Sequence, residues 1–407
     1  MTPLAIRAYT ATTALGHGRD AQADALRHRR SGLRRNDFGS GATAEARLDT
    51  WIGRVDGIED VRLPADLAAL DCRNNRLAWL AFHQDGLPDA VAALRARHGA
   101  ERVAVVIGTS TASIGASEEA YTRLDGDAFP ADLRAPLLHT PHSPGHFVQR
   151  ITGLRGPCVT VATACSSSAK VFAQAARLIH AGLVDAALVG GIDTLCGSVL
   201  FGFNALGLVS TRRCLPFDVR RDGLNLGEAG GYAILERIAD GESAPLRLCG
   251  YGESSDAHHM STPHLEGLGA RLAMADALAR AGIAGIAGDA VGYLNLHGTA
   301  TPANDSVEAA AVAALFPATL HASSTKGWTG HTLGAAGIVE SVFALLALER
   351  GLQPGMLGDD AGGDAQPDPA CGPQIRFDNA ERRIEYAMNN SFGFGGNNCS
   401  LVFGGAA

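Results

Sequence analysis

Short apolar runs alternate with Ala-rich segments of helical periodicity along most of the chain. The clearest strand-like runs are RVAVVIG at 102–108, CVTVATA at 158–164, DAALVGG at 185–191 and YLNLHG at 293–298. Most of the 50 glycines stand singly at the ends of such elements. Buried strands that alternate with helices are typical of α/β proteins, so we predict an α/β fold.

One pattern occurs twice: a strand-like run, a turn, a reactive residue and an apolar helix. The first copy surrounds Cys165 in VTVATACSSSAKVFAQAARLIHAG, and the second surrounds His331 in STKGWTGHTLGAAGIVESVFALLALERG. Two topologically similar halves would explain this repeat. The polar turn at 240–244 is the natural join. We therefore predict an N-terminal half over residues 1–245, with the cysteine, and a C-terminal half over 246–407.

Composition narrows the classes of function. The net charge of −8 argues against nucleic-acid binding, which needs a broad basic surface. The eight cysteines form no CxxC pair, which favours reduced thiols in a cytoplasmic protein over disulfides or zinc. No run reaches about 18 apolar residues, and the N-terminus lacks a signal-peptide pattern, so we expect neither export nor membrane insertion. The Gly-, Pro- and Asp-rich segment 351–374 is predicted to be a surface loop.

Cys165 and two histidines are the candidates for chemistry. A cysteine at the start of a helix is expected to have a depressed pKa, because free N–H groups and the helix dipole stabilise the thiolate. The alternative is a small buried hydrophobe. His297 follows the strand-like run VGYLNL, and His331 lies in a Gly-rich turn that opens an apolar helix. The three residues together favour a catalytic site.

Four motifs carry a resemblance to a known family. TACSSS, HGTATPANDSVEA, KGWTGHTLGAAGIVE and NNSFGFGGNNCSLVF resemble the motifs of Cys-His-His β-ketoacyl-acyl-carrier-protein synthases, in the same order and spacing. The resemblance covers most of the chain and implies the thiolase fold, a five-layered αβαβα body of two similar halves. It also implies decarboxylative Claisen condensation. An acyl thioester and malonyl-carrier protein then give 3-oxoacyl-carrier protein and CO2, in fatty-acid, polyene or polyketide biosynthesis.

The resemblance implies that Cys165 is the nucleophile that takes the acyl group. The backbone N–H groups of Cys165 and Phe394 are then the donors that stabilise the tetrahedral oxyanion. Phe394 lies in SFGFGGNN, where glycines permit a tight turn between the strand-like runs EYAMNN and NCSLVF. A plain glycine-rich hairpin is the alternative, and it is compatible with this role.

The second chemical task is decarboxylation of the malonyl thioester, which needs a stabilised enolate oxygen. Neutral His297 and His331 can donate N–H bonds to that oxygen without a metal, and a helix N-terminus favours the neutral form of His331. Lys326 is expected to turn inward as an ordering and electrostatic residue. Glu340 is its expected ion partner.

Thr299 and Thr301 in HGTATP are candidates to bind the amides of a phosphopantetheine arm, with capping of the next helix as the alternative. His258, His259 and His264 fit no recognised metal-ligand spacing. We therefore expect no metal and interpret their segment as a pocket-lining loop. No cofactor is expected beyond the phosphopantetheine arm of acyl carrier protein, which carries the substrates.

The expected partners are acyl carrier protein and malonyl and acyl thioesters. A homodimer is expected, with a heterodimer with a related synthase or chain-length factor as the alternative. Five arginines form a local basic cluster at Arg27, Arg29, Arg30, Arg34 and Arg35. We interpret this cluster as a solvated helix face, with docking of an acidic carrier protein as the alternative.

Three departures from the family pattern leave the subfamily open: AIRAYTATTALG, GEAGG and GGNN. They remove no catalytic side chain, and the combination resembles synthases of bacterial aryl-polyene pathways. Two other functions compete with condensation. A thiolase needs a second active-site cysteine, and the C-terminal hairpin has none before Cys399. A partner subunit would shape the acyl pocket of a heterodimer, but such subunits typically lack the cysteine that this chain keeps.

Overall fold

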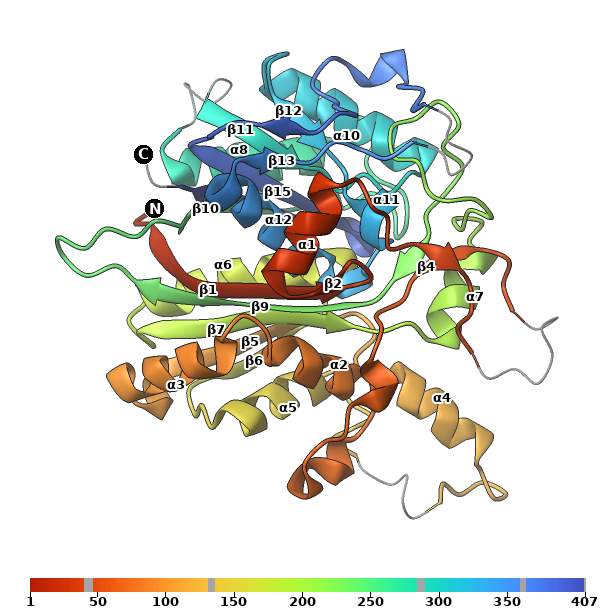
Figure 1. Ribbon diagram of the computed structural model, residues 1–407, viewed down its shortest axis with the longest axis vertical. Helices are drawn as coiled ribbons and strands as arrows, with labels where there is room; N and C mark the ends of the chain where they lie inside the picture. Colours follow the sequence, from red (N-terminus) through yellow and green to blue (C-terminus); the bar gives the residue numbers. More distant parts are fainter. Residues whose placement is uncertain (40–46, 131–135, 284–289, 359–363, 406–407) are drawn as a thin grey trace.

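The computed structural model describes residues 1–39, 47–130, 136–283, 290–358 and 364–405 of the chain. Its strands form a mixed sheet system in two parts (Figure 1). The first part has the order β6 (Cys158–Val161), β5 (Val103–Gly108), β7 (Ala186–Asp193), β9 (Ala229–Arg237) and β1 (Leu4–Thr13). β5 is parallel to β6 and to β7, whereas β9 is antiparallel to β7 and to β1.

The second part repeats this arrangement with strands from the C-terminal portion of the chain. Its order is β12 (His321–Ser323), β11 (Val291–Asn295), β15 (Tyr386–Gly393), β16 (Asn397–Gly404) and β10 (Arg247–Ser255). β11 is parallel to β12 and to β15, and β16 is antiparallel to β15 and to β10. Because strand order and direction agree position by position, the two parts are similar halves. The division near residue 245 stays a prediction of the sequence.

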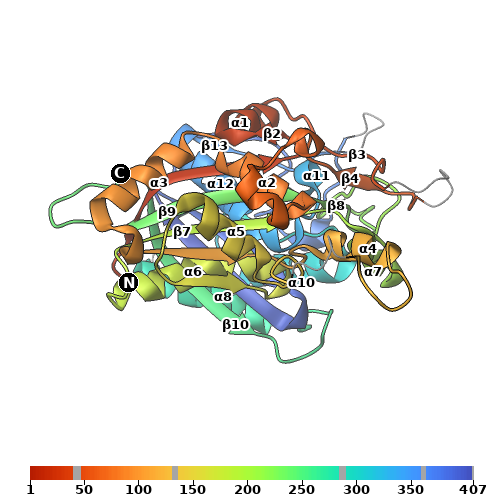
Figure 2. The same ribbon diagram turned by 90° about the horizontal axis from the view of Figure 1, so that it is seen from below.

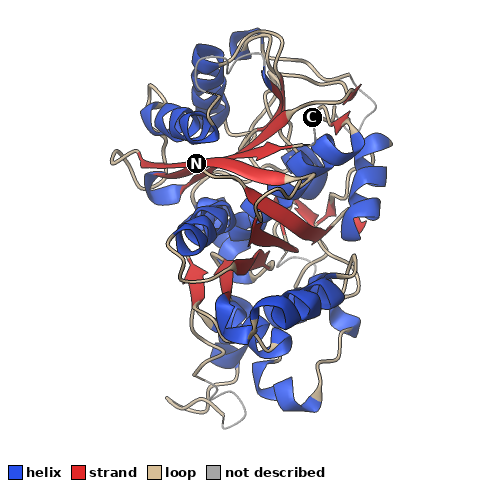
Figure 3. Ribbon diagram, turned by 90° about the vertical axis from the view of Figure 1, so that its left-hand side faces the viewer, coloured by secondary structure: helices blue, strands red, loops and turns tan. Residues whose placement is uncertain are grey.

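Helices form three layers around the two parts of the sheet (Figure 1), and Figure 2 shows the molecule from below, with one outer helical layer in front. The central layer holds α6 (Ser167–His180) and α12 (Ala336–Arg350), which contact both sheets and each other. One outer layer holds α2 (Arg73–Phe82), α3 (Leu87–His98) and α5 (Ser143–Thr152), and the other holds α8 (Leu268–Ala281) and α10 (Pro302–Leu315). The layers are seen edge-on in Figure 3. The predicted five-layered αβαβα body is confirmed.

Shorter elements complete the fold. The helices are α1 (Gly18–Arg27), α4 (Ile114–Thr122), α7 (Gly197–Ala205) and α11 (Lys326–Thr329). The strands are β2 (Gly16–His17), β3 (Arg34–Arg35), β4 (Trp51–Gly53), β8 (Leu226–Gly227), β13 (Leu352–Gln353) and β14 (Ala380–Glu381). The 3₁₀ turns that matter for the site are η6 (Ala164–Ser166), η7 (Leu333–Ala335) and η9 (Phe394–Gly396).

α12 is buried because its sequence is apolar on nearly every face, whereas α6 keeps a polar stripe at Lys170, Gln174 and Arg177. Every residue of α12 from Ala336 to Ala347 is buried, as expected of a helix without a polar side. The two helices also approach closely at Gly337. A Cβ atom at this position would lie 2.2 Å from the backbone nitrogen of Ala169 in α6, so only glycine fits there.

The two central helices begin with matching turns. Ala164 opens η6 with φ of 52°, and Leu333 opens η7 with φ of 58°. Both are left-handed conformations that non-glycine residues seldom adopt, and the two turns contact each other. Cys165 and Gly334 are the second residues of their turns. The repeat seen in the sequence is therefore a structural repeat, and its two copies meet at the centre of the molecule.

The surface-loop prediction for 351–374 is wrong for the start of the segment, whereas residues 364–370 are mostly exposed. Leu352 and Gln353 form β13, which pairs with β14, and Met356 is fully buried. Residues 352–356 follow α12 directly and pack along the core. Their backbone pairs with β14, and a Gly- and Pro-rich composition does not predict such pairing. Residues 359–363 lie outside the described residues. Within the described ranges, no helix has the length and apolar character needed to cross a bilayer.

Candidate active site

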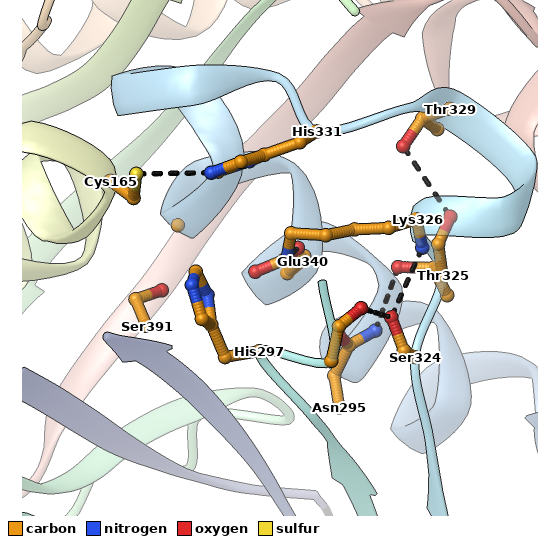
Figure 4. A network of polar contacts seen from close by, with 12 residues as sticks. Cys165, Asn295, His297, Ser324, Thr325, Lys326, Thr329, His331, Glu340 and Ser391 are labelled. Carbon is orange, nitrogen blue, oxygen red and sulfur yellow. Dashed lines mark hydrogen bonds and ion pairs between the residues drawn. The ribbon is translucent and has the colours of Figure 1, made fainter. Parts of the chain in front are cut away.

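Cys165 lies where the two matching turns meet. It is buried, with 5% of its surface exposed, and α6 starts two residues later. Its Sγ atom lies 3.0 Å from Nε2 of His331 (Figure 4). The backbone N–H of Phe394 lies close enough to the sulfur to lower the pKa of the thiol. The nucleophile candidate thus has a ring nitrogen and a backbone donor directed at it.

Backbone contacts fix both histidines. The N–H of His331 donates to the carbonyl of Asn225 at 2.7 Å, and the N–H of Gly227 in β8 donates to the carbonyl of His331 at 2.9 Å. His297 follows the end of β11 by two residues, as predicted. Its N–H donates to Oε1 of Glu308 in α10 at 2.8 Å.

The two imidazole rings lie edge to face. Their centroids are 5.5 Å apart and their planes meet at 86°. Burial lowers the pKa of both rings well below the usual value, and the charge of Lys326 acts in the same direction. Both histidines are therefore neutral at physiological pH. The sequence led us to expect the helix dipole as the cause for His331; in the structure the causes are burial and the charge of Lys326.

The prediction of a depressed pKa for Cys165 is wrong for the structure. Burial raises the pKa of the thiol to about 12, although Lys326 and the Phe394 N–H favour the thiolate. The negative charges of Asp193 and Glu340 add to the rise. Desolvation thus outweighs the helix N-terminus that follows the cysteine.

Lys326 and Glu340 form the expected ion pair. Lys326 is the first residue of α11 and Glu340 lies in α12, and their side chains are 1% and 3% exposed. Burial raises the pKa of Glu340 to about 7. Figure 4 shows the Lys326 and Glu340 side chains between His331 and His297, and the positive charge of Lys326 acts on Cys165 and on both imidazoles.

The C-terminal hairpin brings Phe394 to the cysteine. β15 and β16 pair in register, and η9 connects them with left-handed glycines at 395 and 396. The Phe394 ring stacks on Phe203 of α7, with centroids 5.5 Å apart and planes at 19°. The sequence did not single out Phe203, because GSVLFGFNA is a plain apolar segment whose partner lies almost 200 residues away.

A cavity of about 400 Å³ opens over these residues. Cys165, His297 and His331 line it, together with Thr299 and Thr301. The two threonine hydroxyls lie 2.9 Å apart. Thr301 occupies the N-cap position of α10 but makes no capping hydrogen bond, so the capping alternative does not hold for it.

The 256–264 loop forms another part of the cavity wall, as predicted. His259 and Met260 line the cavity, whereas His258 and His264 do not and instead contact each other. The N–H of Gly395 donates to the carbonyl of Met260 at 2.7 Å, which ties this loop to the hairpin. No cluster of His, Cys, Asp and Glu able to hold a metal occurs among the residues the structure describes.

The arginine cluster is not a helix face. α1 ends at Arg27, and the other members lie in the following turn and in β3. Arg29 donates to the backbone carbonyls of Met356 and Phe377. The other members each have a carboxylate partner: Arg27 with Glu381, Arg30 with Asp24, Arg34 with Asp56, and Arg35 with Asp49. The cluster is thus paired within its own chain, and docking of an acidic carrier protein at this surface stays a prediction.

Two similar α/β halves with a cysteine and two histidines at their meeting point define the thiolase fold. Residues 1–241 match the N-terminal domain of β-ketoacyl synthases, and residues 247–358 match the C-terminal domain. The chain belongs to the β-ketoacyl synthase family.

Individual relatives agree with this family. The chain is 37% identical to the mitochondrial 3-oxoacyl-[acyl-carrier-protein] synthase of Arabidopsis thaliana over 62% of this chain and 57% of that protein. It is 38% identical to 3-oxoacyl-[acyl-carrier-protein] synthase 2 of Vibrio cholerae over 62% of this chain and 63% of that protein. These alignments thus span less than two thirds of the relatives' lengths.

Solved structures extend the comparison to the whole chain. The complex of a ketosynthase with its chain length factor from Xenorhabdus doucetiae matches with a TM-score of 0.86 and 36% identity, over 100% of this chain and 98% of that chain. A β-ketoacyl synthase from Burkholderia phymatum STM815 matches with a TM-score of 0.85 and 28% identity over the full length of both.

Proposed function

We propose that the protein is a β-ketoacyl-acyl-carrier-protein synthase that performs decarboxylative Claisen condensation. The observation that carries the proposal is the 3.0 Å contact between Cys165 Sγ and His331 Nε2, with His297 beside it in one buried cavity. A nucleophile, two neutral N–H donors and a backbone oxyanion donor are what acyl transfer and enolate formation need.

The first half-reaction loads the acyl group. Nε2 of His331 takes the proton of the Cys165 thiol, and the sulfur attacks the thioester carbonyl of the acyl-carrier protein. The backbone N–H groups of Cys165 and Phe394 bind the tetrahedral oxyanion. The bond to the phosphopantetheine sulfur then breaks, and that sulfur leaves with the proton from His331. The product is an acyl thioester on Cys165 and a free carrier thiol.

The second half-reaction forms the carbon–carbon bond. The carboxylate of malonyl-carrier protein leaves as CO2, and its electron pair becomes an enolate whose oxygen accepts N–H bonds from His297 and from His331. Once Cys165 is acylated it no longer donates to Nε2 of His331, and His331 serves as a donor in its Nε2–H tautomer. The enolate carbon attacks the acyl carbonyl on Cys165. The resulting tetrahedral intermediate expels the cysteine sulfur as a thiolate, which takes a proton from solvent, and releases 3-oxoacyl-carrier protein.

Other residues support these steps. Lys326, held by Glu340, favours the thiolate of Cys165 and keeps both imidazoles neutral. Thr299 and Thr301 line the cavity where they can bind the amides of the phosphopantetheine arm. We propose acyl carrier protein as the partner, with no other cofactor, and the cytoplasm as the compartment, since the cysteines are all unpaired.

The quaternary state has two candidates, a homodimer and a heterodimer with a related subunit. The heterodimer is favoured by the Xenorhabdus relative, whose structure is a complex of a ketosynthase with its chain length factor. A thiolase is less well supported, because Cys165 is the only cysteine among the described residues that line the cavity, and Cys399 is fully buried in β16. An aryl-polyene pathway stays a prediction of the sequence.

Intact-protein mass spectrometry tests the proposal. The chain is offered a panel of acyl-carrier proteins, and the added mass is located on a peptide. Acylation at Cys165 and its loss in Cys165→Ala are expected, while Cys371→Ala, a buried cysteine outside the cavity, is expected to load normally. Cys165→Gln should still decarboxylate malonyl-carrier protein, since an amide resembles the acylated state. Full condensation by Cys165→Ala would refute the assignment.

A further inference from the structure

Asp193 is a buried carboxylate that the proposed mechanism does not use. It is the last residue of β7 and has 0% exposed surface. No ion pair to it exists among the described residues; instead, N–H and O–H groups surround it. Such a group is stable in the interior only when donors satisfy it, so the arrangement around it is built for a carboxylate.

The donors to Asp193 come from both halves of the molecule. From the loop after β5, it accepts the hydroxyl of Thr109 at 2.5 Å, the N–H of Ser110 at 2.8 Å and the N–H of Thr111 at 2.9 Å. The Ser110 and Thr111 hydroxyls also donate, at 2.9 and 2.6 Å. From the C-terminal half it accepts the N–H of Gly334 at 2.6 Å. One carboxylate thus joins the 109–111 loop to η7.

Gly334 lies three residues after His331, in the turn that leads into α12. A Cβ atom at this position would lie 2.5 Å from Oδ2 of Asp193 and 2.5 Å from the backbone nitrogen of Ser110. The contact therefore requires glycine. The Asn225 carbonyl and the Gly227 N–H hold the backbone of His331 itself, and Asp193 holds the same segment three residues further on, at Gly334.

We propose that Asp193 is a positioning residue, which ties Gly334 to the 109–111 loop and so holds His331 at hydrogen-bond distance from Cys165. The inference rests on the proposed function for its kinetic consequence. Displacing a reacting group by about 1 Å is enough to lower a rate by about a hundredfold. Asp193 also places a fixed negative charge near the sulfur, opposite to the positive charge of Lys326.

The negative charge of Asp193 affects the pKa of Cys165, and a purely structural role of Asp193 would leave that pKa unchanged. Asp193 and Glu340 raise the pKa of Cys165, whereas Lys326 lowers it, and the two nearby histidines are neutral. Removing the charge of Asp193 alone should move the pKa of Cys165 downward. Alkylation of Cys165 by iodoacetamide follows the thiolate fraction, so its pH midpoint reports this pKa directly.

The experiment compares Asp193→Asn, Asp193→Glu and wild type. The alkylation midpoint at Cys165, followed by peptide mass spectrometry, should fall by about one pH unit in Asp193→Asn and stay in place in Asp193→Glu. The rate constant for acyl loading should fall by roughly 10- to 100-fold in Asp193→Asn with little change in KM, and Asp193→Glu should recover part of it. Glu236→Gln, a buried carboxylate at the far end of β9, is the matched control and should change neither.

Two results would overturn the proposal. The first is an Asp193→Asn variant whose alkylation midpoint and acyl-loading rate both equal those of wild type. The second is an equal loss of loading rate in Asp193→Asn and Asp193→Glu, with no shift of the alkylation midpoint in either variant. If Asp193→Asn does not fold, Thr111→Val, which removes one donor to the carboxylate, should lower the loading rate, and a wild-type rate there is equally contrary. Alkylation needs no substrate, so it tests Asp193 even if wild type fails to load acyl groups and the proposed function is wrong.

Discussion

Removing each active-site histidine in turn should separate acyl loading from decarboxylation. His331 contacts Cys165 directly through Nε2 at 3.0 Å. His297 faces the same cavity but makes no hydrogen bond to Cys165 in the described part of the chain. His297→Ala therefore leaves the surroundings of the thiol intact, whereas His331→Ala removes its partner.

The size of each effect follows from these contacts. Each imidazole supplies one N–H donor to the enolate oxygen, and loss of such a donor costs about 10²- to 10³-fold in rate, or about 2.7–4 kcal/mol. Both variants should lose CO2 release by this amount. A thiol with a pKa of about 12 is thiolate in only about one molecule in ten thousand at pH 8. His331→Ala should therefore also load more slowly, by up to about 10²-fold, while His297→Ala loads within a few-fold of wild type.

Two assays on the same samples check this division. Intact mass measures acyl groups on Cys165, and release of labelled CO2 from malonyl-carrier protein measures decarboxylation. His321→Ala is the control, because His321 is buried but does not line the cavity. A His297→Ala variant that decarboxylates normally but cannot be acylated would show that His297 is the base for Cys165, and the roles proposed for the histidines would be wrong.

Two further substitutions test the electrostatics and the packing. Lys326→Met should raise the pKa of Cys165 and so slow acyl loading at every pH below that pKa. It should also destabilise the fold by about 3–5 kcal/mol, because Glu340 loses its partner. Adding Glu340→Gln should restore the melting temperature but not the loading rate, and recovery of both would contradict the electrostatic role of Lys326. Gly337→Ala should lower the melting temperature by the equivalent of about 1–3 kcal/mol, because its Cβ meets the backbone of Ala169, and an unchanged thermal unfolding curve would contradict that close contact.

The parts of this site that the sequence predicts are those with a local pattern. Cys165 and His297 each follow an apolar strand, and such positions gather at the carboxyl ends of parallel strands, whereas His331 lies in a glycine-rich turn that opens an apolar helix. The Lys326–Glu340 pair could also be predicted from the sequence, since both residues lie within the motif that surrounds His331. For these residues, the chemistry of the side chain and its place at the end of a predicted element both indicate a role in the site.

The parts that the sequence does not predict depend on partners far along the chain. Phe203 acquires its role from Phe394, and Asp193 from Gly334 and the loop after β5. The direction of the pKa shift at Cys165 was wrong for a related reason. A helix start is visible in a sequence, whereas the extent to which both halves exclude water from a thiol is not.

The two matching turns at the centre of the molecule differ in one respect, and this difference sets how many acyl groups one chain can carry. Cys165 and Gly334 occupy equivalent positions, but Asp193 and Ser110 fill the space where a side chain at Gly334 would lie. The duplicated framework therefore has room for only one nucleophile. A titration with an acyl donor should reach its end point at one acyl equivalent per chain, and a dimer with a subunit that lacks the cysteine should reach it at half that value.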